Sequence, residues 1–136
     1  MSTGILYVDD HEIFHECMRQ MFTQRNDMQI LAIASNGQTA VRLATELRPD
    51  VVVMDVRLPG LNGIEATRKI LSTQPRARII GLSGYTDRQT VLAMIKAGAR
   101  GYVVKDAAFN ELIQAIQAVA SGKMYLSPGI TSVMLE

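Results

Sequence analysis

Residues suited to phosphate chemistry follow four short apolar runs of this 136-residue chain. Two acids follow the first run, one follows the second, a hydroxyl follows the third and an ammonium group follows the fourth: Asp9 and Asp10 after residues 5–8, Asp55 after 51–54, Ser83 after 79–82, and Lys105 after 102–104. The carboxyl ends of parallel strands meet at one edge of a sheet, where open α/β folds place their ligands. If the four runs are parallel strands, these side chains share one pocket.

Carboxylates gathered at the ends of neighbouring strands need a cation. Adjacent strands lie about 4.8 Å apart, a separation at which like charges disfavour each other's ionisation. Magnesium suits such a site because it prefers one or two carboxylates, a carbonyl oxygen and several waters, whereas zinc prefers histidine and cysteine ligands. We therefore expect Mg²⁺ at this edge of the sheet.

A divalent ion beside a lysine offers positive charge to a strongly anionic group, and a phosphoryl group fits that description best. Lys105 lies two strands from Asp55, roughly 9 to 10 Å by strand spacing, a gap that its long side chain largely crosses. Ser83, on the strand between them, is placed to donate its hydroxyl to a phosphoryl oxygen. Asp55 is central among these groups, which favours it as the carboxylate nucleophile that attacks phosphorus.

Helices between the apolar runs must position these residues. Runs without alternation are typical of parallel strands that are covered on both faces. Apolar residues at helical spacing recur between the runs; Asn36, Asn62 and Thr86 are capping residues at three helix starts, and Ser121-Gly122 ends the last helix. With residues 30–34 as the second strand, the order is (βα)5. It predicts an α/β doubly wound, flavodoxin-like sandwich with a parallel sheet of order 2-1-3-4-5.

Composition limits what the chain can be. A length of 136 residues with 48% apolar content predicts one domain, which we place at residues 1–121, followed by a tail or the start of a linker at 122–136. The net charge is +1 and the basic residues are scattered along the sequence, so the chain itself is not expected to bind DNA. No apolar run reaches the roughly 20 residues of a membrane span, and the first residues lack a signal-peptide pattern. The single cysteine, Cys17, is expected to be reduced and buried, which fits a cytoplasmic protein.

The combined pattern resembles the receiver domains of two-component response regulators. The resemblance rests on Asp9-Asp10, Asp55 with Leu-Pro-Gly-Leu-Asn-Gly at 58–63, Ser83-Gly84 and Lys105, and it covers residues 4 to about 121. Asp10-His11 and the segment 101–106 are similar to the nitrate-regulator (NarL/FixJ-type) subgroup, whose members usually carry a C-terminal helix-turn-helix domain.

The resemblance implies that Asp55 accepts a phosphoryl group from a phosphohistidine on a sensor histidine kinase. It also implies that Asp9 and Asp10 hold Mg²⁺ together with Asp55 and the backbone carbonyl of Arg57. The domain would then be a signalling switch that catalyses only its own phosphorylation and dephosphorylation.

The resemblance further implies how the switch is read. Ser83 and Lys105 would bind the phosphoryl oxygens, and Tyr102 would be the switch aromatic that moves with the Ser83 hydroxyl. The changed surface, on which a homodimer would form, would be helix four, strand five and helix five, or else helices one and five. Transcription would be controlled through a helix-turn-helix domain outside this chain, so that DNA is bound only there, and no membrane is involved.

Two features depart from the usual receiver pattern. Asp106 follows Lys105 where many receivers have a proline with a cis bond, which costs about 2.5 to 4 kcal/mol before any other residue. Arg57 and Tyr85 lie two positions after Asp55 and Ser83, where bulky side chains would obstruct water. We hypothesise a fairly long-lived phosphoryl group.

Other interpretations stay open. The pair Asp9-Asp10 would also suit a helix N-terminus, and a Mg²⁺-dependent phosphohydrolase with an aspartyl-phosphate intermediate would use Asp55 in the same way. That enzyme class usually carries a second aspartate two residues later, where this chain has Arg57. His11 and His15 lie one helical turn apart and receive no role. Apolar residues on nearly all sides of the segment 91–97 indicate either deep packing or a partner surface.

Overall fold

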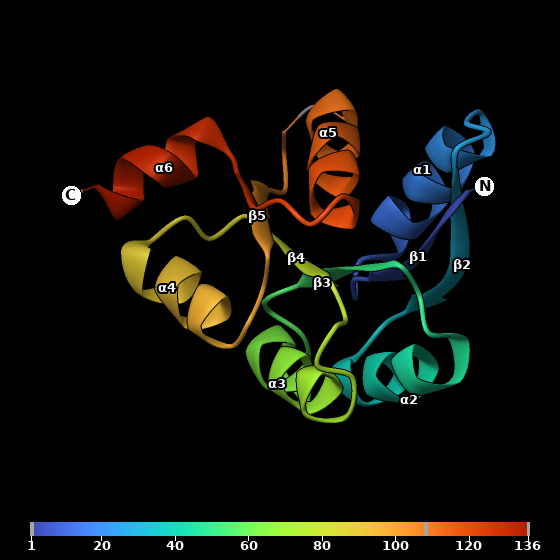
Figure 1. Ribbon diagram of the computed structural model, residues 1–136, viewed down its shortest axis with the longest axis horizontal. Coiled ribbons are helices and arrows are strands. Elements are labelled where there is room, and N and C mark those ends of the chain that lie inside the picture. Colours follow the sequence, from blue (N-terminus) through green and yellow to red (C-terminus); the bar gives the residue numbers. More distant parts are fainter. Residues whose placement is uncertain (1, 108, 136) are drawn as a thin grey trace.

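The structure is a computed structural model that describes residues 2–107 and 109–135. Five strands alternate with five helices and a further short pair follows, so the predicted (βα)5 order is confirmed and extended. The elements are β1 (Thr3–Val8), α1 (Glu12–Thr23), β2 (Met28–Ala34), α2 (Gly37–Leu47), β3 (Val51–Asp55), α3 (Gly63–Thr73), β4 (Ile79–Ser83), α4 (Arg88–Lys96), β5 (Gly101–Val104), α5 (Phe109–Ala120), β6 (Tyr125–Leu126) and α6 (Pro128–Met134). The strands form one parallel sheet of order 2-1-3-4-5-6 (Figure 1).

Apolar residues cover both faces of this sheet. Along β3, Val51 and Val53 belong to the core cluster shared with α1 and α5, whereas Val52 and Met54 belong to the cluster shared with α2, α3 and α4. All four side chains are at most 1% exposed. Figure 1 shows α1 and α5 on one side of the sheet and α2, α3 and α4 on the other. The sheet is therefore a central layer that fixes the residues at its ends.

Side-chain caps begin the helices α2, α3 and α4. Asn36 and Asn62 accept a hydrogen bond from the amide three residues on, at 2.8 and 2.9 Å, as predicted. For α4 the cap is Asp87, which accepts from the Thr90 amide at 3.0 Å, and the predicted cap Thr86 is wrong by one residue. A carboxylate at this position also interacts favourably with the positive end of the helix.

The segment predicted as a tail contains β6 and α6. β6 pairs in parallel with β5, and α6 lies beside α4 (Figure 1). Ile130 of α6 is fully buried in the core cluster of α2, α3 and α4. A two-residue strand shows no periodicity, and Ser127-Pro128-Gly129 is typical of a linker, so the sequence pattern predicted neither element. Residues 125–134 are thus packed structure rather than a linker stub, and a connection to a further domain stays a prediction.

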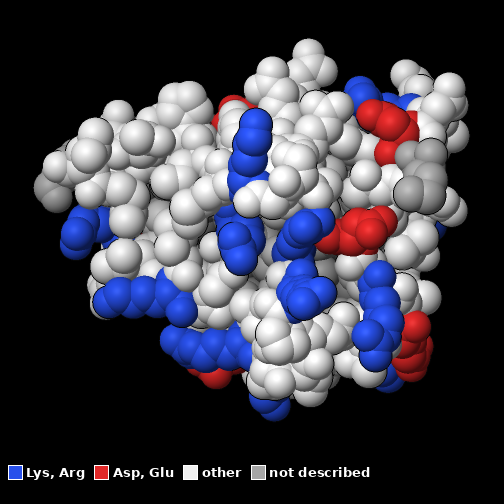
Figure 2. All heavy atoms as spheres, viewed as in Figure 1, with Lys and Arg blue, Asp and Glu red and all other residues white. Residues whose placement is uncertain are grey.

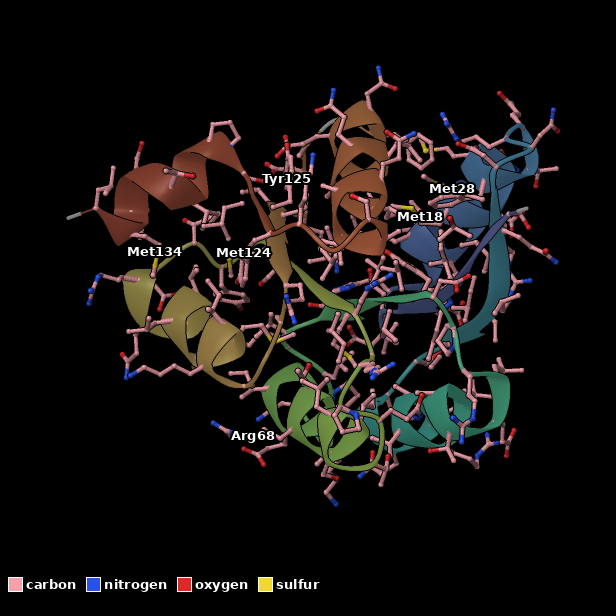
Figure 3. The ribbon with its side chains drawn as sticks, viewed as in Figure 1. Met18, Met28, Arg68, Met124, Tyr125 and Met134 are labelled. Carbon is pink, nitrogen blue, oxygen red and sulfur yellow. The ribbon has the colours of Figure 1, made fainter. Side chains whose placement is uncertain are left out.

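The apolar character of α4 is explained by this packing. Ile95 of α4, Leu126 of β6 and Met134 of α6 all pack against the same core cluster. Figure 3 shows the Met134 side chain pointing from α6 toward α4. The chain itself therefore covers a side of α4 that the sheet leaves open.

The first helix, by contrast, exposes part of its apolar stripe. Met18 and Phe22 pack in the cluster shared with α5, but Ile13 is 72% exposed and Met21 is 41% exposed. Cys17 is exposed too, so the expected buried thiol is wrong. The reason is that the stripe is wider than the surface that α1 buries on the sheet. None of the helices in the described ranges is both long enough and apolar enough to cross a bilayer.

Candidate functional site at the carboxyl edge of the sheet

The polar residues predicted from the strand ends meet at one edge of the sheet. Asp9 follows β1, Asp55 ends β3, Ser83 ends β4 and Lys105 follows β5, and these four strands are neighbours in the sheet (Figure 1). Asp9, Asp55 and Ser83 are at most 3% exposed. The edge is therefore a buried polar pocket within an apolar layer.

Lys105 joins the two buried acids. Its Nζ lies 3.0 Å from a carboxylate oxygen of Asp9 and 3.0 Å from Oδ2 of Asp55. The side chain is only 12% exposed, and Nζ lies 4.7 Å from the centre of the Phe14 ring on α1. The predicted reach across two strands is thus observed. All peptide bonds in the described residues are trans, including the bond from Lys105 to Asp106.

Two hydrogen-bond donors besides Lys105 hold the Asp9 carboxylate, and a ring nitrogen of His11 lies beside it. The hydroxyl of Tyr7 donates to Oδ2 at 2.8 Å, and the backbone amide of His11 donates to Oδ1 at 3.0 Å. Nδ1 of His11 lies 2.9 Å from the same oxygen. Burial and the neighbouring Asp9 raise the pKa of Tyr7, which keeps its hydroxyl a neutral donor. This network fixes the orientation of the Asp9 carboxylate.

The loop after β3 closes tightly over Asp55. The Arg57 amide donates to Asp55 Oδ1 at 3.3 Å. A Cβ added at Gly63, the first residue of α3, would lie 2.2 Å from the carbonyl oxygen of Asp55, so only glycine allows this close approach. The Gly63 amide also donates to the Val56 carbonyl at 2.9 Å. Asp55 is thereby fixed by its own strand and by the start of the next helix.

The acids and one histidine could hold a divalent cation. One oxygen each of Asp9, Asp10 and Asp55 and one ring nitrogen of His11 lie within 4.8 Å of one another. Three carboxylates are the hard oxygen donors that Mg²⁺ prefers, so the residues fit that ion. His11 joins this cluster although the sequence analysis gave it no role. The sequence contains a signal for this contact, because His11 directly follows Asp10.

Burial and the neighbouring charges shift the pKa values of the ionisable groups in opposite directions. Burial raises the pKa of Asp55 and outweighs the effect of Lys105, so this pKa lies above its usual value. Burial also acts to raise the pKa of Asp9, but hydrogen bonds from the His11 amide, Lys105 and Tyr7 outweigh it and the net shift is downward. Burial lowers the pKa of Lys105, and the two carboxylates more than reverse this. An added cation would therefore stabilise the buried Asp55 carboxylate.

Ser83 and Tyr102 are linked through one residue of the β4–α4 loop. The Tyr85 amide donates to Ser83 Oγ at 3.0 Å, and the hydroxyl of Tyr102 donates to the Tyr85 carbonyl at 2.6 Å. Tyr102 is completely buried. Ser83 Oγ accepts that bond, so its own proton is free to donate into the pocket. A movement of Ser83 would be felt by Tyr102 through Tyr85.

Arg57 and Tyr85 lie together at the rim of the pocket. The Arg57 guanidinium carbon lies 4.1 Å from the centre of the Tyr85 ring. Both residues are exposed, and they connect the loops after β3 and β4. The stacked pair lies on the loops that follow Asp55 and Ser83, and its effect on the access of water to the pocket stays a prediction.

Comparison with known proteins identifies relatives of the chain. A family model described as the response regulator receiver domain matches residues 5–117. Response regulator GacA of Pseudomonas aeruginosa is 38% identical over 126 residues, which are 93% of this chain and 59% of that protein. The nitrate/nitrite response regulator protein NarL of Escherichia coli strain K12 is 33% identical over 130 residues, 96% of this chain and 60% of that protein. The chain thus spans about 60% of the length of these curated relatives.

A solved structure agrees over the whole chain. The two-component response regulator of the LuxR family from Aurantimonas sp. SI85-9A1 has a TM-score of 0.94 and 38% identity, and the match covers 99% of this chain and 96% of that one. The match extends beyond residue 121, so β6 and α6 are included in the shared fold.

Proposed function

This chain belongs to the response regulator receiver family, and from that premise we propose that it is the phospho-acceptor domain of a two-component response regulator, phosphorylated on Asp55 by a sensor histidine kinase. The observation that carries the proposal is the contact of Lys105 with both buried acids at the carboxyl edge of the sheet. A lysine held there by charge is ready to bind an incoming phosphoryl group, and the raised pKa of Asp55 marks a carboxylate that has spare affinity for positive charge.

The reaction is a phosphoryl transfer between two side chains. An oxygen of Asp55 forms a bond to phosphorus while the bond from phosphorus to the kinase histidine nitrogen breaks, and that nitrogen keeps the electron pair. Lys105 and the Ser83 hydroxyl bind the phosphoryl oxygens. A bound Mg²⁺, which Asp9, Asp10, Asp55 and the Arg57 carbonyl would hold, would offset part of the negative charge of the acids and of the phosphoryl group. The product is an acyl phosphate, and the protein turns over no other substrate.

Tyr102 transmits the change in this proposal. When Ser83 turns toward the phosphoryl group, its bond to the Tyr85 amide is released and the loop that holds the Tyr102 hydroxyl is free to move. The domain is then a two-state element biased by a local change of charge. The output is transcription, through a helix-turn-helix domain outside this chain. A cytoplasmic location belongs to the same proposal, because an exposed single thiol such as Cys17 persists in a reducing compartment.

Acetyl phosphate tests the chemistry without the kinase. Incubation of the chain with acetyl phosphate and Mg²⁺ should give one acyl phosphate per molecule by intact-protein mass spectrometry, and Asp55→Asn should remove it. Asp106→Asn is a matched control, because Asp106 is an exposed carboxylate that follows Lys105. Catalytic release of phosphate without a stable adduct, which is the behaviour of a phosphohydrolase, or an adduct that survives Asp55→Asn, would contradict the proposal.

We place the homodimer of the active state on α1 and α5 rather than on α4, β5 and α5. What supports this is that β6 and α6 cover the β5 edge and α4, whereas Ile13 and Met21 stay exposed on α1. Met21→Glu should therefore prevent the dimerisation that phosphorylation induces, as measured by sedimentation velocity. Thr131→Glu, on the exposed side of α6, should leave it unchanged. The reverse result would assign the dimer to the other face.

A further inference from the structure

The amino ends of the strands carry arginines, at the edge of the sheet opposite the acidic pocket. Arg78 immediately precedes β4 and Arg100 immediately precedes β5. The Arg100 amide donates to the Ile79 carbonyl at 2.8 Å, so the two strand starts lie side by side. In the shared view of Figures 1 and 2, basic side chains lie over the middle of the sheet, where β4 and β5 are seen. Arg78 and Arg100, which are far apart in the sequence, are therefore neighbours in space.

These arginines line two adjoining hollows. Arg76, Arg78 and Arg100 line one of about 230 Å³, with Val119 and Gly122 at the end of α5 on its other side. A second hollow of about 390 Å³ shares Arg76 and adds Arg48. Among the described residues that line either hollow, none is Asp or Glu. The smaller hollow is several times the volume of one water, about 30 Å³, so it has room for a hydrated oxyanion.

The guanidinium groups of both hollows lack acidic partners in the described part of the chain. The ion pairs at 4.0 Å or less include none of the four arginines. Arg25, Arg42 and Arg68, by contrast, each contact an acid. Arg78 is instead fixed by donating to the Ala120 carbonyl, at the negative end of α5. Like charges held together in this way repel one another and favour an anionic ligand.

We propose that the two hollows lined by Arg48, Arg76, Arg78 and Arg100 bind a ligand with linked phosphate groups. The planar fork of arginine pairs two donors with two phosphate oxygens, which a lysine does not. Arg76 belongs to both hollows, so it bridges neighbouring phosphates of one ligand. The same chemistry is offered by a pyrophosphate-type small molecule and by the backbone of a nucleic acid. The site does not depend on phosphorylation of Asp55, because it lies at the other edge of the sheet.

Calorimetry with inorganic pyrophosphate tests the site. We expect saturable one-site binding to the chain in EDTA, with shifts of the Gly101 and Gly122 amides in NMR spectra. Arg76→Gln with Arg100→Gln should weaken binding about tenfold or more, since two charged contacts are lost. These two exposed arginines are chosen because neither side chain makes a hydrogen bond or ion pair within the described residues. Arg42→Gln with Arg68→Gln is the control, because it removes the same charge from α2 and α3. Figure 3 labels Arg68 on α3.

A second binding assay, with duplex DNA, identifies which kind of molecule supplies the phosphate groups. The site binds a nucleic-acid backbone if the chain binds a labelled duplex, pyrophosphate displaces that duplex, and the Arg76→Gln/Arg100→Gln variant no longer binds it. Pyrophosphate binding without duplex binding assigns it to a small ligand. Absence of saturable binding of either probe, or an equal loss in the control variant, would overturn the proposal. The double variant should still accept phosphate from acetyl phosphate on Asp55, which shows that it is folded and separates this test from the proposed function.

Discussion

At the residue scale, the acidic pocket places unfavourable charge at Asp55, the residue that we propose accepts the phosphoryl group. Asp9 and Asp55 share one buried cation, Lys105, and the pKa of Asp55 is raised mainly by burial. An acid whose pKa is higher in the folded state binds its proton more tightly there, so stability falls as pH rises through that range. Ionisation of Asp55 therefore lowers the free energy of unfolding. If Asp55 is the phospho-acceptor, activity and stability are opposed at this residue.

We expect Asp55→Asn to stabilise the metal-free protein by about 1 kcal/mol, because the amide removes a buried charge. The measurement is Tm by calorimetry in EDTA at pH 7. The difference in Tm between the variant and the wild type should shrink as pH falls through the raised pKa of Asp55, since Asp55 of the wild type is then uncharged as well. Mg²⁺ should raise the Tm of the wild type more than that of the variant.

The control for this prediction is Asp87→Asn. Hydrogen bonds from Thr90 lower the pKa of the exposed Asp87, the opposite direction to Asp55. Asparagine is also a good helix cap, so this substitution should not raise Tm. A variant Asp55→Asn that melts below the wild type in EDTA would contradict the account of the pocket.

The rim pair Arg57 and Tyr85 should slow loss of the phosphoryl group. The Arg57 guanidinium carbon lies 4.1 Å from the centre of the Tyr85 ring, and these two bulky side chains lie on the loops that follow Asp55 and Ser83. Arg57→Ala with Tyr85→Ala should speed hydrolysis of the acyl phosphate by about tenfold, because water gains access to phosphorus. The decay is followed by intact-protein mass spectrometry after removal of acetyl phosphate. Arg25→Ala with Asp27→Ala removes another surface contact and should not change the rate. An unchanged rate in the rim variant would count against the hypothesis.

At the element scale, the sequence predicted the strands that are buried on both faces. Continuous apolar runs such as Val51–Met54 appear only where helices cover both sides of a sheet, so strand identity and order followed from the pattern. The pocket followed too, because Asp9, Asp55 and Lys105 come directly at strand ends. Each of these inferences depended on local spacing and on one rule of topology.

Elements and contacts set by tertiary packing were not predictable in this way. β6 has two residues and no period, and α6 begins at Pro128, which is typical of a linker but equally of a first helical turn. The contact of His11 with Asp9 depends on the direction of one side chain. Arg78 and Arg100 become neighbours through the pairing of β4 with β5. The predicted strand order implied that pairing, but the predictions from it concerned only the carboxyl edge of the sheet.

Ser127 should be a main attachment of the β6–α6 segment. The Ser127 side chain accepts from the Val104 amide at 3.2 Å and donates to Glu111, and its amide donates to the Tyr102 carbonyl at 3.0 Å. Ser127→Ala should lower the free energy of unfolding by about 1 to 3 kcal/mol, because it leaves a buried amide without its acceptor. Urea denaturation measures the change. Ser132→Ala, at an exposed position of α6, should stay within about 0.5 kcal/mol of the wild type.

The buried contact of α6 predicts a larger loss. Ile130 is fully buried, and Ile130→Ala should cost about 2 to 5 kcal/mol. If α6 were a loosely attached linker, both Ile130→Ala and Ser127→Ala would instead leave the urea midpoint unchanged.

At the scale of the whole molecule, one strand connects the pocket with the C-terminal segment. β5 holds Tyr102, Lys105 follows it, and the same strand pairs with β6 and bonds to Ser127. In the proposed function, a phosphoryl group that binds Lys105 would therefore act directly on the backbone that anchors β6 and α6. Any domain that follows α6 would be reached by this route, whereas β2 lies at the far edge of the sheet.

Phosphorylation should accordingly change hydrogen exchange in β6 and α6 but not in β2. We expect exchange rates of the Val104 and Ser127 amides to change by about fivefold or more on treatment with acetyl phosphate and Mg²⁺, the size of a typical coupling between sites. Amides of Ile30 and Ala32 are the internal reference. Ser127→Ala should reduce the response of α6 while Asp55 is still phosphorylated, because the link from Val104 is cut. An equal change in β2, or a full response of α6 in that variant, would show that the signal travels by another path.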